Sequence, residues 1–400
     1  MTGVTILGST GSIGVYTLDV LRLHQDQYAV FALTANRGVA KMREQCLEFG
    51  PRFAVMRDKS SAAELDRQLS AVNCPTTVLG GDDALVEVVR AAECDAVMAA
   101  IVGGAGLGPT IAAAQAGKRV LLANKESLVM AGEIFMRAVV EGGAMLLPID
   151  SEHSAIYQCL ANGAVGHAGG VRRLWLTGSG GPLLRLPLEE MGQVTPGQAC
   201  AHPNWKMGRK ISVDSATMMN KGLELIEACW LFDVDPASVE IVIHPQSIVH
   251  SMVEYEDGSV LAQLGNPDMR TPIAHGLAWP DRIESGTRQL DLVEIGRLEF
   301  EAVDVRRFPC LRLARAVAGR EQSLSIALNA ANETAVQAFL DELIAFTAIP
   351  IIVEKVLEQT QARNAHTIED VLEIDKEARM RAAVVMKSLY DAGPARNSHD

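Results

Sequence analysis

The sequence predicts an α/β protein whose N-terminal part is a doubly wound, mainly parallel sheet. Short apolar runs alternate with segments of helical periodicity there, which is typical of repeated strand and helix units. Hydrophobic residues make up 48% of the chain and aromatic residues only 4%, a composition typical of helices packed on parallel strands. A chain of 400 residues exceeds what one core usually supports, so we expect about two to three domains.

We expect residues 1–149 to form the first domain. Its first strand is the apolar run Val4–Leu7, and the helix after the following glycine-rich turn is expected from about Ile13 to Leu23. Because strands and helices alternate, the strands are expected to lie parallel in one sheet. The further strands are expected at 28–33, 53–56, 96–102, 119–122 and 144–149.

Residues 150–279 are expected to form an α+β catalytic domain, because Gly, Ser, Thr and His become more frequent there. Strand-like runs in this part lie at 171–177, 239–243 and 260–264.

The last part of the chain is expected to be a linker followed by a helical domain. Residues 280–309 are charged and weakly periodic, which predicts the linker. Residues 310–400 predict helices, because apolar residues recur at helical spacing and Thr367–Asp370 resembles a helix start. The recurring apolar residues are Val336, Phe339, Leu340 and Leu343.

The charge and the cysteines restrict the class of partner. A formal net charge of -13 opposes non-specific binding to nucleic acids or anionic membranes. The seven cysteines are scattered and contain no C-x-x-C pair, as is typical of reduced cytosolic thiols. The first strand begins close to Met1, and no long apolar span is present. We therefore expect a soluble, cytoplasmic protein with a small-molecule substrate, no nucleic-acid partner and no membrane association.

A glycine-rich turn follows the first strand. Its sequence is Gly8-Ser9-Thr10-Gly11-Ser12-Ile13-Gly14, a variant of the dinucleotide-binding fingerprint. The glycines let the backbone approach a pyrophosphate, whose charge is met by N–H groups at the start of the helix. A tight turn without a ligand is the alternative.

The second strand predicts which dinucleotide binds. It ends in Asn36-Arg37-Gly38, without the acid that holds the ribose hydroxyls in NAD enzymes. Arg37 is expected to pair with a 2′-phosphate instead, which favours NADPH. A solvated surface arginine is the alternative.

The segment Asn124-Lys125-Glu126-Ser127 follows the expected strand 119–122, at the sheet edge where open α/β sheets bind ligands. Lys125 is expected to hydrogen-bond a substrate hydroxyl, and Glu126 to orient the substrate. A helix-capping loop with an exposed ion pair is the alternative.

Two acids follow the expected strand 144–149. Residues two apart in an extended segment project to the same side, so Asp150 and Glu152 are expected to face one ligand. With Glu224 as a third acid, they predict an oxygen-rich site for Mg²⁺ or Mn²⁺.

A phosphate pocket is expected beside the third acid. Asn220 and Lys221 lie about one helical turn before Glu224, so all three side chains can share a helix face. Together with Ser215 they would form a cationic, hydroxyl-rich pocket. An exposed Lys–Glu pair is the alternative.

Two loops are expected to complete the site. Thr177–Pro182 is glycine-rich and places Ser179 to donate to an anion. His202–Gly208 carries Trp205 between flexible ends and is expected to be a mobile lid. A plain turn and an indole that covers the edge of the core are the alternatives. The histidines within 244–250 are left out of the site, because a lone histidine is more often structural.

These motifs together resemble the 1-deoxy-D-xylulose 5-phosphate reductoisomerase family over essentially the whole chain. The resemblance implies an NADPH-dependent and metal-dependent rearrangement and reduction of 1-deoxy-D-xylulose 5-phosphate, with Mg²⁺, Mn²⁺ or Co²⁺ as the metal. It also implies a homodimer and a C-terminal helical bundle. The family often has Gly-Lys-Asn where this chain has Asn36-Arg37-Gly38, so the positive charge is kept while the adenosine contacts are left open.

The resemblance implies a role for each site residue. The implied metal ligands and catalytic acids are Asp150, Glu152 and Glu224, with Lys125 as a further catalytic residue. The implied substrate contacts, including the phosphate site, are Lys125, Ser151, Glu152, Ser179, His202, Trp205, Ser215, Asn220, Lys221 and Glu224. The implied NADPH contacts are Thr10, Gly11, Ser12, Ile13, Asn124, Glu126 and Gly208. Asn36, Arg37 and Gly38 are expected as coenzyme contacts because they follow the second strand.

Two other functions fit parts of the sequence. An ordinary NADP-dependent dehydrogenase would show reduction without carbon migration and without metal dependence. A nucleotide-sensing protein needs the glycine turn but has no use for three acids together with phosphate donors.

Overall fold

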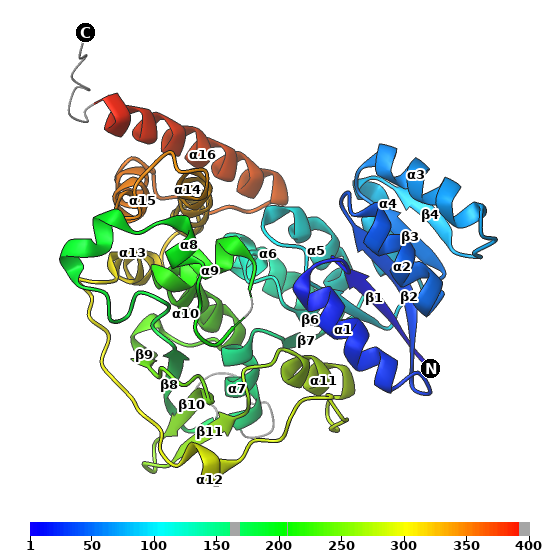
Figure 1. The fold of residues 1–400 in the computed structure, drawn as a ribbon, viewed down its shortest axis with the longest axis horizontal. Helices are drawn as coiled ribbons and strands as arrows, with labels where there is room; N and C mark the ends of the chain where they lie inside the picture. The colour runs from blue at the N-terminus through cyan, green and yellow to red at the C-terminus, as the bar shows by residue number, and fades with distance from the viewer. Residues whose placement is uncertain (161–168, 206, 392–400) are drawn as a thin grey trace. The chain divides into compact units, whose positions relative to one another are not determined.

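The computed structural model describes residues 1–160, 169–205 and 207–391 (Figure 1). Contacts divide the chain into two compact units. The first unit comprises Met1–Leu128, Gly132–Val171 and Ile248–Arg297. The second unit comprises Val129–Ala131, Arg172–Ser247 and Leu298–Asp400. The functional domain boundaries expected from the sequence remain predictions.

The first unit contains a seven-stranded parallel sheet in the order β4-β3-β2-β1-β5-β6-β7. Strand order reverses at β1, so the turn after β1 lies at the position where doubly wound sheets bind ligands. The strands are β1 (Thr2–Leu7), β2 (Tyr28–Ala35), β3 (Phe53–Met56), β4 (Thr77–Gly80), β5 (Ala96–Ala99), β6 (Arg119–Leu122) and β7 (Met145–Pro148). The helices among them are α1 (Ser12–Leu23), α2 (Val39–Phe49), α3 (Lys59–Ser70), α4 (Asp82–Arg90), α5 (Leu107–Gln115), α6 (Glu126–Gly142) and α7 (Ser151–Cys159).

The predicted Rossmann-like fold is confirmed, and β4 and β5 differ most from the expected strands. β4 was missed, because this short strand is half exposed and lacks the continuous apolar run of a buried strand. β5 ends at Ala99, three residues before the expected end, and a 3₁₀ helix, η1 (Gly104–Gly106), follows.

The core of the first unit includes a helix from much later in the chain. Ile273, Ala274 and Leu277 of α11 (Arg270–Ala278) are buried against the strands and helices of the parallel sheet. Gly276 makes the approach possible, since a Cβ there would lie 2.7 Å from Cδ1 of Ile149. The antiparallel pair β10 (Val249–Tyr255) and β11 (Val260–Leu264) and the short α12 (Leu292–Ile295) also belong to this unit.

The second unit combines a parallel strand pair with helices. β8 (Val171–Gly178) pairs with β9 (Val239–Ile243), and Glu301 forms an antiparallel bridge with Ile243. Its other elements are η4 (Leu188–Gln193), α8 (Pro196–Ala199), α9 (Arg209–Ala216), α10 (Met219–Phe232), η5 (Pro236–Ser238), α13 (Pro309–Val317), α14 (Gln322–Leu340), α15 (Ala348–Glu358) and α16 (Ile368–Asp391).

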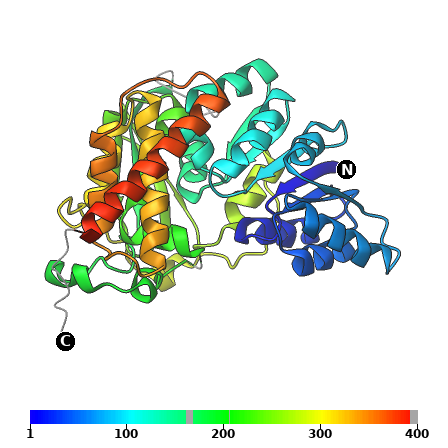
Figure 2. The same cartoon turned by 90° about the horizontal axis from the view of Figure 1, so that it is seen from above.

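The C-terminal helices α14, α15 and α16 pack against one another, as Figure 2 shows. The predicted helix start is confirmed: Thr367 Oγ1 accepts from Asp370 N, and Asp370 Oδ2 accepts from Thr367 N. The expectation for Leu343 is wrong, because α14 ends at Leu340 and the Leu343 side chain is exposed. Within the described parts of the chain, no helix combines the length and apolarity needed to cross a membrane.

Candidate functional site

The turn after β1 has the shape of a pyrophosphate cradle. Gly8 has φ +85°, and a Cβ on it would lie 2.8 Å from the carbonyl oxygen of Ala100. A Cβ on Gly14 would lie 2.4 Å from Cα of Ser9, so α1 can pack against the turn only without a side chain there. Gly11 and Ser12 are exposed where α1 begins. Backbone N–H groups at this helix start can therefore meet an anion closely.

Two residues that sequence reasoning missed hold this turn in place. Ser9 is fully buried; its hydroxyl donates to Gln45 Oε1 at 2.8 Å, and Gln45 Nε2 donates to the Ser9 carbonyl at 2.9 Å. Thr34 Oγ1 accepts from Gly8 N at 2.9 Å. These contacts join segments more than 20 positions apart, so local spacing contained no signal for them.

The loop Asn36–Gly38 after β2 lies beside the glycine turn. A Cβ on Gly38 would lie 3.7 Å from the Thr10 side chain, and Lys41 Nζ donates to the Thr10 carbonyl at 2.9 Å. Arg37 has 78% of its side chain exposed, with Nε 3.7 Å from Asp58 Oδ2. The glycine turn and the loop Asn36–Gly38 therefore lie side by side after β1 and β2.

The segment that begins α6 is more buried than a simple capping loop. Asn124, just before the N-cap residue Lys125, accepts a hydrogen bond from Ser127 N at its Oδ1 at 3.1 Å. However, Glu126 is only 5% exposed, and Lys125 Nζ pairs with Asp150 Oδ2 at 2.7 Å with both side chains largely buried. The ion pair of Lys125 is therefore with the predicted metal ligand Asp150 and is not exposed.

The expected extended conformation of the acid pair is wrong. α7 begins at Ser151, so Asp150 is its N-cap residue and Glu152 lies in its first turn. Their carboxylates approach because both stand at one helix start, where the helix dipole favours negative charge. An oxygen of Asp150 lies within 4.8 Å of an oxygen of Glu152. Ser151 is buried, and its hydroxyl donates to Glu152 Oε2 at 2.7 Å.

In the second unit, His202 organises the hydroxyl of Ser179. The backbone N–H groups of Asn204 and Trp205 both donate to His202 Nδ1, at 3.2 and 3.0 Å. Nδ1 is therefore the acceptor of a neutral ring, and Nε2–H donates to Ser179 Oγ at 2.9 Å. Gly181 N also donates to that oxygen at 3.1 Å. With two donors on its oxygen, Ser179 is oriented to donate its own proton to an anion.

Glycines bring the other predicted phosphate residues to this loop. A Cβ on Gly178 would lie 3.1 Å from Cε of Lys221. Gly181 has φ +68°, and a Cβ on it would lie 2.7 Å from the carbonyl oxygen of Ser215. The expected association of the Ser179 loop with Ser215 and Lys221 is thus present within this unit.

The shared helix face of α10 is confirmed. Asn220 Nδ2 donates to Glu224 Oε1 at 2.5 Å, and Lys221 Nζ pairs with Glu224 Oε2. The alternative of an exposed pair is wrong, because Glu224 has no exposed surface and Lys221 is 5% exposed. Burying two charges is costly without compensating contacts, which fits a site built for charged ligands.

The segment expected to be a lid is anchored at one residue. Asn204 Nδ2 donates to the Pro245 carbonyl at 2.7 Å and to Ser247 Oγ at 2.9 Å, an anchor that the sequence did not reveal. Trp205 is half-buried, and Gly208 is the N-cap residue of α9 in the second unit. Lys206 lies outside the described residues, and closure remains a prediction.

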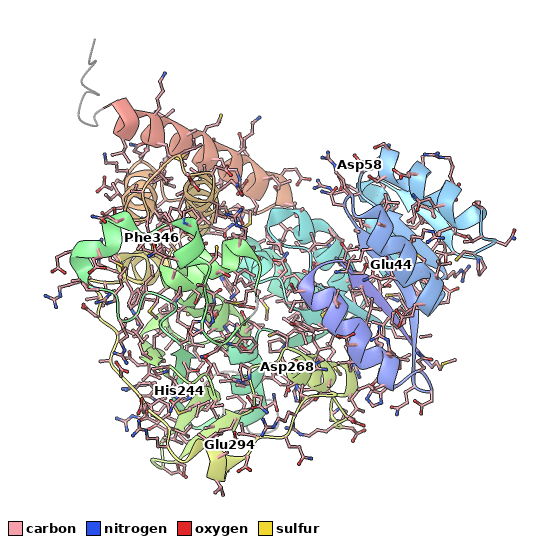
Figure 3. The ribbon with its side chains drawn as sticks, viewed as in Figure 1. Glu44, Asp58, His244, Asp268, Glu294 and Phe346 are labelled. Carbon is pink, nitrogen blue, oxygen red and sulfur yellow. The ribbon has the colours of Figure 1, made fainter. Side chains whose placement is uncertain are left out.

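His244, which was left out of the site, has a structural environment. Its ring stacks on Phe300 at 4.8 Å, and Nδ1 lies 2.8 Å from the Glu299 carbonyl oxygen; Figure 3 labels this residue near the end of β9. Burial lowers its pKa, so the ring is neutral near pH 7.

A glycine turn shaped for a pyrophosphate, together with buried carboxylates and anion donors, defines a dinucleotide-dependent enzyme of the Rossmann-like class. The chain belongs to the 1-deoxy-D-xylulose 5-phosphate reductoisomerase family. The family model of that description matches residues 4–132, and models of C-terminal domains of the same enzyme match residues 146–232 and 264–381.

Relatives and solved structures of this family match the chain over almost its full length. The 1-deoxy-D-xylulose 5-phosphate reductoisomerase of Cellvibrio japonicus is 58% identical, covering 96% of this chain and 98% of the relative. The enzyme of Stutzerimonas stutzeri is 60% identical, covering 94% of this chain and 96% of the relative. A crystal structure of a DOX-P reductoisomerase in complex with NADPH, fosmidomycin and magnesium has a TM-score of 0.93 at 48% identity, covering 98% of this chain and 99% of that chain. The structure of the Zymomonas mobilis enzyme in complex with NADPH has a TM-score of 0.89 at 48% identity, covering 97% of this chain and 99% of that chain.

Proposed function

We propose that this protein converts 1-deoxy-D-xylulose 5-phosphate to 2-C-methyl-D-erythritol 4-phosphate with NADPH and a divalent metal, a step of non-mevalonate isoprenoid biosynthesis. The observation that carries this function is the buried Lys221–Glu224 pair, with Asn220 on the same carboxylate, beside the Ser179 loop in a chain of this family. An ordinary dehydrogenase or a nucleotide sensor has no need for such a buried group.

NADPH fits the first unit. The glycine turn leaves no room for a Cβ at Gly8 or Gly14, and the N–H groups at the start of α1 can hold the pyrophosphate. Arg37 supplies the charge for the 2′-phosphate, and Asn124 and Glu126, which follow β6, are further contacts of the coenzyme. When bound, NADPH supplies the hydride that reduces the aldehyde formed by the rearrangement.

A divalent cation fits the carboxylates. We propose Asp150, Glu152 and Glu224 as its ligands, because oxygen donors are those that Mg²⁺ and Mn²⁺ prefer. When bound, the cation polarises the substrate ketone and holds the neighbouring hydroxyl group. Ser151 holds Glu152 in position by its 2.7 Å hydrogen bond.

The protein side chains bind and orient the phosphosugar. Ser179, Ser215, Asn220 and Lys221 bind the phosphate, and the neutral Nε2–H of His202 keeps the Ser179 hydroxyl oriented as a donor. Lys125 donates to a substrate hydroxyl.

Trp205 covers the carbon backbone of the substrate and keeps water from the reacting atoms. We propose that the enzyme is a homodimer, as the family resemblance implies, and that it is cytoplasmic, as the scattered cysteines indicate.

The test is to mix the protein with 1-deoxy-D-xylulose 5-phosphate, NADPH and Mg²⁺ or Mn²⁺, follow NADPH absorbance and identify the product. We expect the branched phosphosugar, with turnover that a chelator stops. Reduction without carbon migration, or turnover that survives chelation, would support the ordinary dehydrogenase instead.

A further inference from the structure

The end of β3 lies beside the loop expected to bind the adenosine part of the coenzyme. Arg57 N donates to the Ala35 carbonyl at 2.9 Å, and Asp58 N donates to the Asn36 carbonyl at 3.3 Å. Figure 3 labels Asp58 at the start of α3. The Asp58 carboxylate therefore lies at the edge that also carries Arg37 and Gly38.

The two oxygens of Asp58 have different surroundings. Oδ1 accepts from Ser61 N and Ser61 Oγ, both at 2.9 Å, and from Ser60 Oγ at 2.5 Å. Oδ2 faces Arg37 Nε at 3.7 Å. Hydrogen bonds from Ser60 and Ser61, with a smaller contribution from Arg37, lower the Asp58 pKa to about 2, so the group is ionised at neutral pH.

Arg37 and Asp58 differ in how firmly they are held. The Arg37 side chain is 78% exposed and 26% of the Asp58 side chain is exposed, so their ion pair adds little to stability. Asp58 is fixed by three hydrogen bonds, so it cannot easily move away when Arg37 turns toward an anion. A 2′-phosphate at Arg37 therefore meets a fixed negative charge, whereas a ribose 2′-hydroxyl meets an acceptor.

We propose that Asp58 is a specificity-determining residue that limits the preference of the enzyme for NADPH over NADH. It opposes the 2′-phosphate and accepts a hydrogen bond from the 2′-hydroxyl of NADH, and so takes part of the role of the acid missing after β2. This inference rests on the proposed NADPH-dependent function and on Arg37 as the 2′-phosphate contact.

The neighbouring charges have other partners. Arg57 Nε pairs with Asp82 Oδ1 at 2.6 Å, and Lys41 Nζ donates to the Thr10 carbonyl at 2.9 Å. Asp82 also begins a helix and pairs with an arginine, one strand further along the sheet. It is therefore a matched control for the loss of one negative charge in this region.

The experiment compares Asp58→Asn with Asp82→Asn. Asparagine is a good N-cap residue, so α3 should remain intact, and Asp58→Ser provides a second uncharged cap. Dissociation constants for NADPH and NADH are measured by titration of coenzyme fluorescence. Adenosine 2′,5′-bisphosphate and AMP are measured by displacement, so that no turnover is needed.

Both Asp58 variants should bind NADPH and adenosine 2′,5′-bisphosphate about three- to tenfold more tightly, from the Coulomb interaction of nearby exposed charges. NADH and AMP should bind equally well or more weakly. Asp82→Asn should leave the ratio of the NADPH and NADH dissociation constants unchanged. When Arg37 is also replaced by Ala, the Asp58 variants should still bind NADPH more tightly than Arg37→Ala alone, because Asp58 repels the 2′-phosphate directly.

The assignment of Asp58 would be overturned if the ratio of the NADPH and NADH dissociation constants were unchanged in both Asp58 variants, or if this ratio shifted equally in Asp82→Asn. If the unaltered protein still makes the branched phosphosugar, the proposed function then stands alone. An unaltered protein that binds neither coenzyme would overturn both.

Discussion

Lys221 and Glu224 form an ion pair on α10, in which Glu224 has no exposed surface and the Lys221 side chain is 6% exposed. Asn220 donates to the other oxygen of the same carboxylate at 2.5 Å. Two expected phosphate donors are thus held by an expected metal ligand. A cation bound by Glu224 would compete with these donors and would make Lys221 more available to a phosphate.

Replacing Glu224 by Gln should show that this pair matters for both stability and activity. Removing one partner of a buried pair leaves an uncompensated charge, so the free energy of unfolding should fall by about 3–5 kcal/mol. Denaturant unfolding measures this loss. The double variant Lys221→Met with Glu224→Gln should regain most of the stability and remain inactive. A double variant as active as the unaltered enzyme would contradict a functional role for the pair.

Local sequence signals predicted the regular elements well. β3, β6 and β9 begin and end where their apolar runs do, and the cap at Thr367 and Asp370 starts α16 as expected. In these cases the signal depends on neighbouring residues alone.

Apart from the short, half-exposed strand β4, the missed features depend on contacts between distant segments, with one exception. The return of α11 to the first core requires Gly276 to meet Ile149, and no periodicity in either segment shows this. The exception is α7, because Asp150 followed by Ser151 and Glu152 is a usual helix start. The strand before it was predicted to extend too far. The prediction that the two carboxylates lie close together was therefore right, but the predicted extended backbone was wrong.

The same limit applies to the site. The spacing of Asn220 and Glu224 predicted a shared face but not its burial, because burial depends on what packs over the helix. The supports of the glycine turn, Thr34 and Gln45, and the anchor of Asn204 at Ser247 lie too far along the chain for any spacing rule.

Stability should depend on pH through His275. Burial lowers the pKa of this ring from 6.5 to about 4, and Tyr157 and Trp279 surround it edge-on. Between pH 6.5 and 4 the unfolded chain binds the proton more readily, so stability is present above this range and is lost as pH falls. The loss from pH 7 to pH 4 should be about 3 kcal/mol.

Unfolding of His275→Gln across the same pH range is the measurement. The variant keeps the contributions of all carboxylates, so the difference between the two pH profiles isolates His275. Parallel profiles would show that folding does not lower the pKa of His275.

Replacing Gly14 by Ala should disrupt the coenzyme turn. The new Cβ would lie 2.4 Å from the backbone of Ser9, so α1 must move away from the turn. We expect a loss of about 1–3 kcal/mol in unfolding free energy and at least tenfold weaker NADPH binding by fluorescence titration, as estimated for overpacking. Gly192→Ala is the control, because a Cβ there meets no atom within 4 Å. Equal NADPH affinity in both variants would remove the close-approach argument.

Arg37→Ala should weaken NADPH binding more than NADH binding. A charge-assisted contact with the 2′-phosphate would contribute about 1–3 kcal/mol, and NADH lacks that group. Coenzyme titrations at two salt concentrations measure the effect, which should shrink at high salt because the side chain is exposed. Equal losses for both coenzymes would return Arg37 to a solvated surface residue.

Glu152→Gln should separate metal chemistry from coenzyme binding. The substitution keeps the shape of the side chain at the start of α7 and removes the charge that a divalent cation needs. Turnover should collapse, Mn²⁺ affinity measured by calorimetry should fall at least tenfold, and NADPH affinity should stay the same, since the glycine turn lies on a different loop of the sheet. Glu133→Gln is the matched control, because Glu133 is a half-exposed acid on α6 that faces Arg137 at 3.9 Å on the same helix. Full activity of Glu152→Gln across a metal titration would remove Glu152 from the metal site and leave its bond with Ser151 as a structural contact.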